Sequence, residues 1–287
     1  MLGAYLELVR PANVATALGD VLAGFAVAGL GNSGALPWLL VSTACLYAGG
    51  VVLNDVFDRH VDAVERPERP LPSGRVAASH AAALGAGLLA AGVLAAALGT
   101  DEAGRTAVAI AVAVLLYDGW SKKNPVLGPL NMGACRGLNL SLGMAAVPGT
   151  IAVYWPLCLI PTAYIAGVTR LSRGEVSGGR HSSSTFSLVF VALSIAAVFF
   201  VVISMNRHVW PALAVATLFA WRVVPAFFQA CRTPTPAAIR AAVKRGVLSL
   251  VLLDAALATA FAGIGYGLVL LAAALGSLWL GRTFSVT

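Results

Sequence analysis

The sequence predicts an all-α, polytopic membrane protein with nine or ten transmembrane helices. Of its 287 residues, 59% are hydrophobic and only 11% are charged, and the mean hydropathy is +0.86. A water-soluble domain of this length needs more polar residues to cover its surface. Apolar runs of about 20 residues also recur along the whole chain, and each is long enough to cross a bilayer as a helix.

Ten apolar stretches define the expected helices. The first follows Glu7 and Arg10, is long and is soon followed by another, so an uncleaved first helix is favoured over a signal peptide. Only the short segment 263–267 separates the last two, which leaves nine or ten spans open. In chain order, the stretches are 12–30, 36–57, 79–99, 105–121, 126–147, 152–169, 185–205, 209–229, 238–261 and 263–281.

Lysine and arginine are unevenly distributed between the two ends of these helices. With the N-terminus in the cytoplasm and ten spans, Arg105 and Arg207 fall outside, Arg136 and Arg222 fall within spans, and 15 of the 19 basic residues are cytoplasmic. Cytoplasmic segments are typically enriched in these residues. The 15 are Arg10, Arg59, Arg66, Arg69, Arg75, Lys122, Lys123, Arg170, Arg173, Arg180, Arg232, Arg240, Lys244, Arg245 and Arg282.

This distribution predicts an integral protein of a bacterial-type inner (plasma) membrane, with its N-terminus and polar loops in the cytoplasm. The net charge of +7 then reflects topology and affinity for anionic membrane lipid and substrate, and no nucleic-acid partner is expected. We expect one domain over 1–287, because no linker or fixed-period repeat is present. The cysteines are also not spaced as metal ligands, and we expect them to be small buried residues.

Polar residues concentrate in the expected cytoplasmic segments 58–78, 170–184 and 230–246, where a rigid scaffold would position a site. Asn54, Asp58 and Asp62 recur every four residues, so on a helix they share one face over two turns. The helix must end by about Arg66, because prolines follow. Three oxygen-bearing side chains on one face predict a site for a hard divalent cation, and Mg²⁺ favours carboxylates with water and substrate phosphate.

Arginines follow this acidic face directly. Arg66, Arg69 and Arg75 could pair with phosphate oxygens. Carboxylates for a metal beside arginines for an anion predict a site for a metal-complexed diphosphate. The alternative is that these charges are solvated or paired with one another.

The same stretch resembles a known signature. From Asn54 to Gly74 the chain reads N-D-x-x-D-x-x-x-D and then R-P-x-R-P-L-P-S-G, which is similar to the first motif of the UbiA superfamily of intramembrane prenyltransferases. The phrase RPANVATALGDVLAG in the first helix, the span count and the position of the motif at the end of the second span agree with this resemblance.

The resemblance implies a helical bundle around a central cavity, with a site at the cytoplasmic face. Such proteins bind a polyprenyl diphosphate through Mg²⁺, and its ionisation gives an allylic cation that a lipophilic acceptor attacks. Transferred residue by residue, it implies catalytic roles for Asp58, Asp62 and Lys122. It further implies that Asn54 joins the two aspartates as a metal ligand, and that Arg66, Arg69 and Lys122 contact the diphosphate. The acceptor stays open: an aromatic, quinone-type or other secondary metabolite, a tetrapyrrole or a glycerol phosphate lipid.

The second family motif departs from the pattern. Where D-x-x-x-D is usual, the chain reads TRLSRGEVSGGRHSSS, with Glu175 as its only acid. Glu175 could bind a second Mg²⁺, the arginines could replace that metal, with Arg173 contacting the diphosphate, or Glu175 could simply pair with Arg173. This loop resembles that of the UbiA-like EboC proteins of bacterial ebo-type gene clusters.

Other polar residues suggest further contacts. Family members often show Tyr-x-x-x-Lys, whereas here Tyr117 and Lys122 are one residue further apart, so Lys122 or Lys123 could reach the diphosphate. Polar groups inside spans usually pair or line a cavity. Three such residues are expected in the acceptor pocket, and Arg136 could also pair with Asp20 or Asp118 or point at the diphosphate. The three are Asn13, Arg136 and Asn139.

Two other functions stay open. The incomplete second motif is compatible with a protein that binds or transports a prenylated lipid on the same scaffold without catalysis. An ion-coupled transporter is less favoured, because the chain shows no pair of interrupted helices in corresponding halves.

Overall fold

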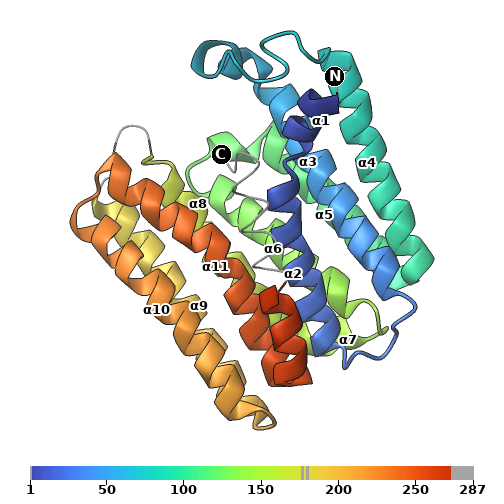
Figure 1. Ribbon diagram of the computed structural model, residues 1–287, viewed down its shortest axis with the longest axis vertical. Coiled ribbons are helices and arrows are strands. Elements are labelled where there is room, and N and C mark those ends of the chain that lie inside the picture. Colours follow the sequence, from blue (N-terminus) through green and yellow to red (C-terminus); the bar gives the residue numbers. More distant parts are fainter. Residues whose placement is uncertain (1, 176–177, 179–180, 273–287) are drawn as a thin grey trace.

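The structure is a computed structural model that describes residues 2–175, 178 and 181–272. Every regular element in this part is helical, as the composition predicts (Figure 1). The elements are α1 (Leu2–Val9), α2 (Pro11–Val27), α3 (Leu36–Glu65), α4 (Ala78–Gly99), α5 (Asp101–Gly119), the 3-10 turn η1 (Ser121–Lys123), α6 (Leu127–Met144), α7 (Thr150–Tyr154), the 3-10 turn η2 (Trp155–Cys158), α8 (Leu159–Ser172), α9 (His181–Met205), α10 (Val209–Arg232) and α11 (Pro236–Ala262).

The predicted count of nine or ten spans is not confirmed. The described residues form eleven α-helices, and six helical segments are long and apolar enough to cross a membrane. These six segments make the chain an integral membrane protein. One reason for the difference is that α2 has only 17 residues and ends at Val27, because Gly29 and Leu30 then adopt positive φ angles. Residues 273–281 of the expected last span lie outside the described residues.

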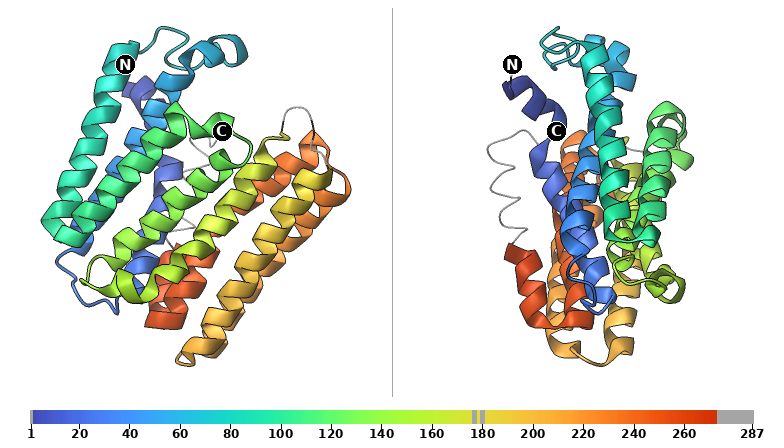
Figure 2. Two further views of the ribbon diagram at one scale, coloured as in Figure 1. Left: turned by 180° about the vertical axis from the view of Figure 1, so that it is seen from behind. Right: turned by 90° about the vertical axis from the view of Figure 1, so that its right-hand side faces the viewer.

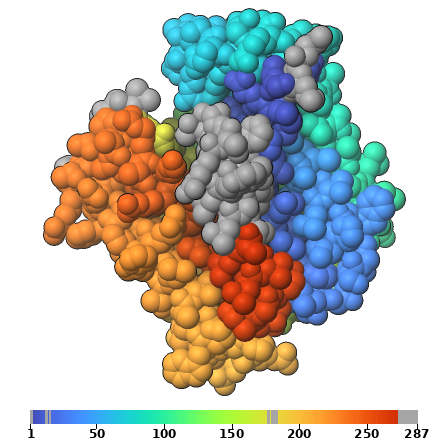
Figure 3. Space-filling model, viewed as in Figure 1, coloured from blue at the N-terminus to red at the C-terminus, as the bar shows by residue number. Residues whose placement is uncertain are grey.

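The long helices form a closed ring in which each packs against its neighbours. The order around the ring is α2, α3, α4, α5, α6, α8, α9, α10 and α11, which returns to α2 (Figure 2). Helices α2 and α6 also pack against each other, so they divide the ring into an N-terminal and a C-terminal half. In the space-filling view, loop 66–77 and the N-terminal helices occupy one side and α10 and α11 the other (Figure 3).

The contact between α2 and α6 is a backbone contact at glycine. Gly24 and Gly143 face each other, and a Cβ on either would overlap a carbonyl oxygen of the opposite helix. Small residues let membrane helices approach this closely. The C-terminal half is filled by apolar side chains such as Tyr164, Phe219 and Leu253. A second apolar cluster fills the end of the N-terminal half that is remote from loop 66–77.

Candidate functional site

The motif lies on the last turns of α3, where this helix continues beyond the apolar stretch as the spacing predicts. The helix ends at Glu65, and the backbone N–H of Arg66 donates to the Asp62 carbonyl at 2.8 Å. Proline at 67 and 70 prevents the helix from continuing. We call this side of the bundle the motif end. Loop 66–77, η1 and the start of the α8–α9 connection lie there.

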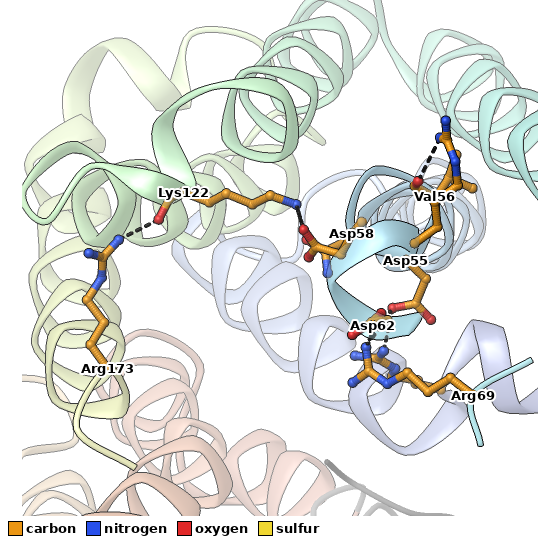
Figure 4. Close-up of polar contacts among 10 residues, drawn as sticks. Asp55, Val56, Asp58, Asp62, Arg69, Lys122 and Arg173 are labelled. Carbon is orange, nitrogen blue, oxygen red and sulfur yellow. Dashed lines mark hydrogen bonds and ion pairs between the residues drawn. The ribbon is translucent and has the colours of Figure 1, made fainter. Parts of the chain in front are cut away.

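Two motif oxygens converge on one cation. The Lys122 ammonium lies 2.6 Å from Asp58 Oδ1 and 3.3 Å from Asn54 Oδ1. Figure 4 shows Asp58 and Lys122 pointing toward each other, from α3 and η1 respectively. Lys122 is placed there because α5 ends at Gly119 and η1 turns the chain back toward α6. Asn54, Asp58 and Lys122 therefore meet at one place, whereas the neighbouring Lys123 is exposed.

Asp62 has a different partner from Asn54 and Asp58. Its Oδ2 accepts a hydrogen bond from Arg69 at 2.8 Å, and the same guanidinium reaches Asp55 Oδ1 at 3.5 Å. Asp55 also pairs with Arg10 at 2.6 Å. These carboxylates are almost fully buried, so their charge needs partners of opposite sign. The alternative that the motif charges pair with one another thus describes Asp55 and Asp62.

Loop 66–77 is fastened to the N-terminus. Arg75 makes two hydrogen bonds to the carboxylate of Glu7, at 2.8 and 3.2 Å, and one to the carbonyl of Glu68. Together with the Arg69 contacts, this bidentate pair holds the loop over α1 and the end of α3.

The second loop approaches the first through backbone atoms. Arg173 donates to the carbonyls of Lys122 and Asn124, the latter at 2.8 Å, and Arg170 donates to the carbonyl of Pro125 at 2.9 Å. Figure 4 shows Arg173 reaching the backbone that carries Lys122. Arg173, expected to contact diphosphate, thus uses its guanidinium to hold the turn that carries Lys122.

Glu175 is half-buried, and its carbonyl accepts a hydrogen bond from Arg240 at 3.0 Å. Partial burial raises the pKa of the Glu175 carboxyl above its usual value, although Arg240 and Arg66 oppose this shift. The nearby positive charges are therefore those of Arg240 and Arg66, from α11 and loop 66–77. Arg173, the partner considered from the sequence, faces the turn after α5.

A cavity of about 250 Å³ extends from the motif into the N-terminal half of the ring. Its polar rim is formed by Asn54, Tyr117 and Asp118, and its deepest polar residues are Arg136 and Asn139. Between them the walls are mainly apolar. The remaining lining residues are Arg10, Thr43, Leu46, Tyr47, Gly50, Val51, Ile110, Val114, Met132 and Cys135.

The deep end of the cavity is closed by a hydrogen-bonded cluster. Arg136 pairs with Asp20 at 2.9 Å, which settles the choice of partner left open by the sequence, and it also donates to Thr16. Asn139 donates to Asp20 at 3.0 Å and accepts from Thr43 at 2.6 Å. Arg136 and Asn139 therefore line the cavity, and their hydrogen bonds connect α2, α3 and α6. The side chain of Asn13 lies outside the described residues.

The paired oxygens of Asn54 and Asp58 suit a hard cation. An ammonium group already lies between them, and such oxygens are the ligands that Mg²⁺ prefers. Within the described residues, no group of three or more His, Cys, Asp or Glu side chains forms a metal site. The donor set thus fits an ion that completes its coordination with water and substrate phosphate, as Mg²⁺ usually does.

The sequence profile of the UbiA prenyltransferase family matches residues 15–224. The chain belongs to this family. Among UbiA relatives, the digeranylgeranylglyceryl phosphate synthase of Methanopyrus kandleri is 33% identical over 174 residues, which covers 58% of this chain and 60% of that relative. The alignment thus spans about three fifths of the relative's length.

Solved UbiA structures share the fold. An apo UbiA homologue from Aeropyrum pernix has a TM-score of 0.70 at 16% identity and covers 86% of this chain and 97% of its own. A homologue from Archaeoglobus fulgidus, bound to DMAPP and Mg²⁺, has a TM-score of 0.65 at 17% identity and covers 93% of this chain and 99% of its own.

Three residues at the site were given no role there by the sequence analysis. Arg10 forms an ion pair with Asp55 of the motif, and Asp118 lines the cavity. Asp55 is adjacent to Asn54 in the motif itself, so its position was visible but its partner was not. Arg10 and Asp55 are 45 residues apart, and no local spacing could have joined them.

Proposed function

We propose that this UbiA protein is a prenyltransferase that moves a prenyl group from a polyprenyl diphosphate to a lipophilic acceptor, with Mg²⁺. The observation that carries the proposal is the convergence of Asn54, Asp58 and Lys122 at the rim of a largely apolar cavity. Acidic and amide oxygens suit the metal, the cation suits the diphosphate, and the apolar walls suit an isoprenoid.

The proposed ligands of Mg²⁺ are Asn54, Asp58 and Asp62, with Glu175 from the facing loop as a candidate for a second ion. When bound, Mg²⁺ neutralises charge on the departing diphosphate. Lys122, Arg66 and Arg69 supply further positive charge to the same oxygens, which stabilises the transition state more than the bound substrate. The apolar cavity keeps water away from the allylic carbon. The cations that now neutralise Asp58 and Asp62 are therefore the groups that we assign to the diphosphate.

The acceptor is proposed from the relatives. The M. kandleri protein is named for digeranylgeranylglyceryl phosphate synthesis, and the A. fulgidus homologue was solved with DMAPP and Mg²⁺. We propose a prenylated glycerol phosphate as the first acceptor to test, with aromatic and quinone-type acceptors next. The likeness of the second loop to EboC proteins would leave the acceptor open.

The orientation and membrane are proposed from charge. With the motif end in the cytoplasm, the basic loops face the compartment that supplies soluble Mg²⁺, and lipid-soluble substrates reach the cavity from the membrane. A plasma membrane of bacterial type agrees with this distribution.

The test is pyrophosphate release by purified protein in lipid nanodiscs, with Mg²⁺, prenyl diphosphates of several lengths and a panel of acceptors. We expect release with a matching acceptor, its abolition in Asp58→Ala, and normal release in Asp101→Asn, which changes an exposed acid at the opposite end of α5. Unchanged turnover in Asp58→Ala would overturn the metal assignment. Binding of prenyl diphosphate without release for any acceptor would favour the prenyl-lipid binding or transport alternative.

A further inference from the structure

Asp118 is the only carboxylate among the residues that line the cavity. It lies on the last turn of α5 and is only 4% exposed. Its Oδ2 is buried and has no hydrogen-bond partner among the described residues. A buried carboxylate oxygen without a partner is costly, so Asp118 needs a partner that the described residues do not supply.

The surroundings of Asp118 hold charge of both signs. From α3, Asp55 and Asp58 face it, and from η1 Lys122 does. Cys135 of α6 lies close to it, Arg136 of the same helix lines the cavity with it, and its own neighbour Tyr117 is also in the wall. The list of cavity residues adds Arg10 and Tyr47. Asp55 and Asp58 are engaged by Arg10 and Lys122, whereas Asp118, a carboxylate in the cavity wall, has an oxygen with no hydrogen-bond partner among the described residues.

The proposed transfer must release a proton. The bond from the allylic carbon to the diphosphate oxygen breaks, and the diphosphate leaves with the electron pair. A new bond forms from that carbon to the acceptor's hydroxyl oxygen or ring carbon. The O–H or C–H bond of the attacking atom then breaks, its electrons stay with the acceptor, and the proton needs a base within reach.

We propose that the carboxylate of Asp118 is the general base that takes this proton. The inference rests on the proposed function and adds a catalytic residue on the wall of the cavity opposite the α3 motif. The other acids near the site are less suited. Asp20 is fixed by Arg136 and Asn139, and Asp62 is fixed by Arg69.

The test compares wild type with Asp118→Asn, which keeps shape and removes the base. With acceptor present, we expect kcat to fall about 10²-fold or more, while the KM for the prenyl diphosphate changes little. The wild-type kcat should fall as the pH is lowered and Asp118 becomes protonated. This acidic limb of the pH profile should be missing in Asp118→Asn. Asp118→Glu should restore part of the rate and the acidic limb.

Two further measurements keep the outcome decisive. Binding of a non-hydrolysable prenyl diphosphate to Asp118→Asn should match wild type, which shows that the variant is folded. The circular dichroism spectrum of Asp118→Asn should also match that of wild type. If Asp118→Asn transfers at the wild-type rate with the wild-type pH profile, the base is another group, such as the departing diphosphate. That result would leave the prenyltransferase proposal intact, whereas a wild type inactive with every acceptor would remove both.

Discussion

Lys122 and Lys123 are neighbours in sequence but occupy different surroundings. The ammonium of Lys122 lies between Asn54 and Asp58, whereas Lys123 is exposed. We expect Lys122→Met to lower kcat by about 10²–10³-fold, because a preorganised positive charge is lost from the departing diphosphate. Lys123→Met should be close to wild type. Steady-state kinetics on both variants measures the difference, and equal effects would show that only the summed charge matters.

Thr43 and Ser42 form a matched pair in the core of α3. Both are buried, but Thr43 donates to Asn139 at 2.6 Å, whereas Ser42 Oγ has no partner among the described residues. Thr43→Val leaves the Asn139 carbonyl unpaired, so we expect it to destabilise the fold by about 1–3 kcal/mol. Ser42→Ala should be neutral or slightly stabilising. Thermal unfolding in detergent compares the two, and equal shifts would contradict the role of the hydrogen bond.

The sequence predicted the positions of the motif residues on their helix better than it predicted their partners. The four-residue period placed Asn54 and Asp58 on a shared face, where Lys122 contacts both, but Asp62 is turned to Arg69. Periodicity describes one helix. It carries no information about a loop that folds back from seven residues downstream, or about Arg10 arriving from another helix.

At the scale of elements, the α2–α6 crossing depends on glycine. A Cβ at Gly143 would overlap the carbonyl of Val21, whereas one at Gly87 on α4 would meet nothing within 4 Å. We expect Gly143→Ala to cost about 1–3 kcal/mol through forced separation of the helices. Gly87→Ala should be neutral or gain up to about 1 kcal/mol from helix propensity. A stable Gly143→Ala variant would mean that the helices separate easily there.

The contact between the end of α8 and η1 gives a second prediction for elements. Arg173 holds the carbonyls of Lys122 and Asn124, so Arg173→Met should loosen the turn that carries Lys122. We expect kcat to fall while Mg²⁺ and diphosphate still bind. Arg105→Met, an exposed arginine at the far end of α5, is the control. A wild-type kcat in Arg173→Lys would show that only the positive charge matters at this position, because lysine has a single ammonium and cannot reproduce the guanidinium geometry.

At the scale of the whole molecule, the property to be tested is the orientation of the protein in the membrane. The charge distribution predicts that the motif end faces the cytoplasm. In a chain without its native cysteines, Ser73→Cys at the motif end should be labelled by an impermeant maleimide only in inverted vesicles. Arg207→Cys, exposed at the opposite end, should be labelled only in right-side-out vesicles. The reverse pattern would place the site outside the cytoplasm.

Composition was sufficient for the fold class, because a chain this apolar can hide its backbone polar groups only in membrane helices or in a large core. The number of spans was not predictable, since hydropathy does not show where positive φ angles end α2 or where a short 3-10 turn interrupts the chain before α8. The close contact between α2 and α6 that divides the ring could not be read from sequence either. It depends on glycine pairs such as Gly24 and Gly143, which look ordinary until the two helices are placed side by side.

The cavity beside the motif is closed by packed side chains at its deep end. Below Asn139 and Thr43, the N-terminal half is filled by tightly packed residues such as Leu39 and Leu142, and the α2–α6 seam leaves no room for a side chain between the backbones. A cavity that is closed at this end provides no route for a lipid to the opposite leaflet. A substrate that enters from the motif end or from the surrounding lipid must leave by the same route. The product therefore has to be released before the next donor binds.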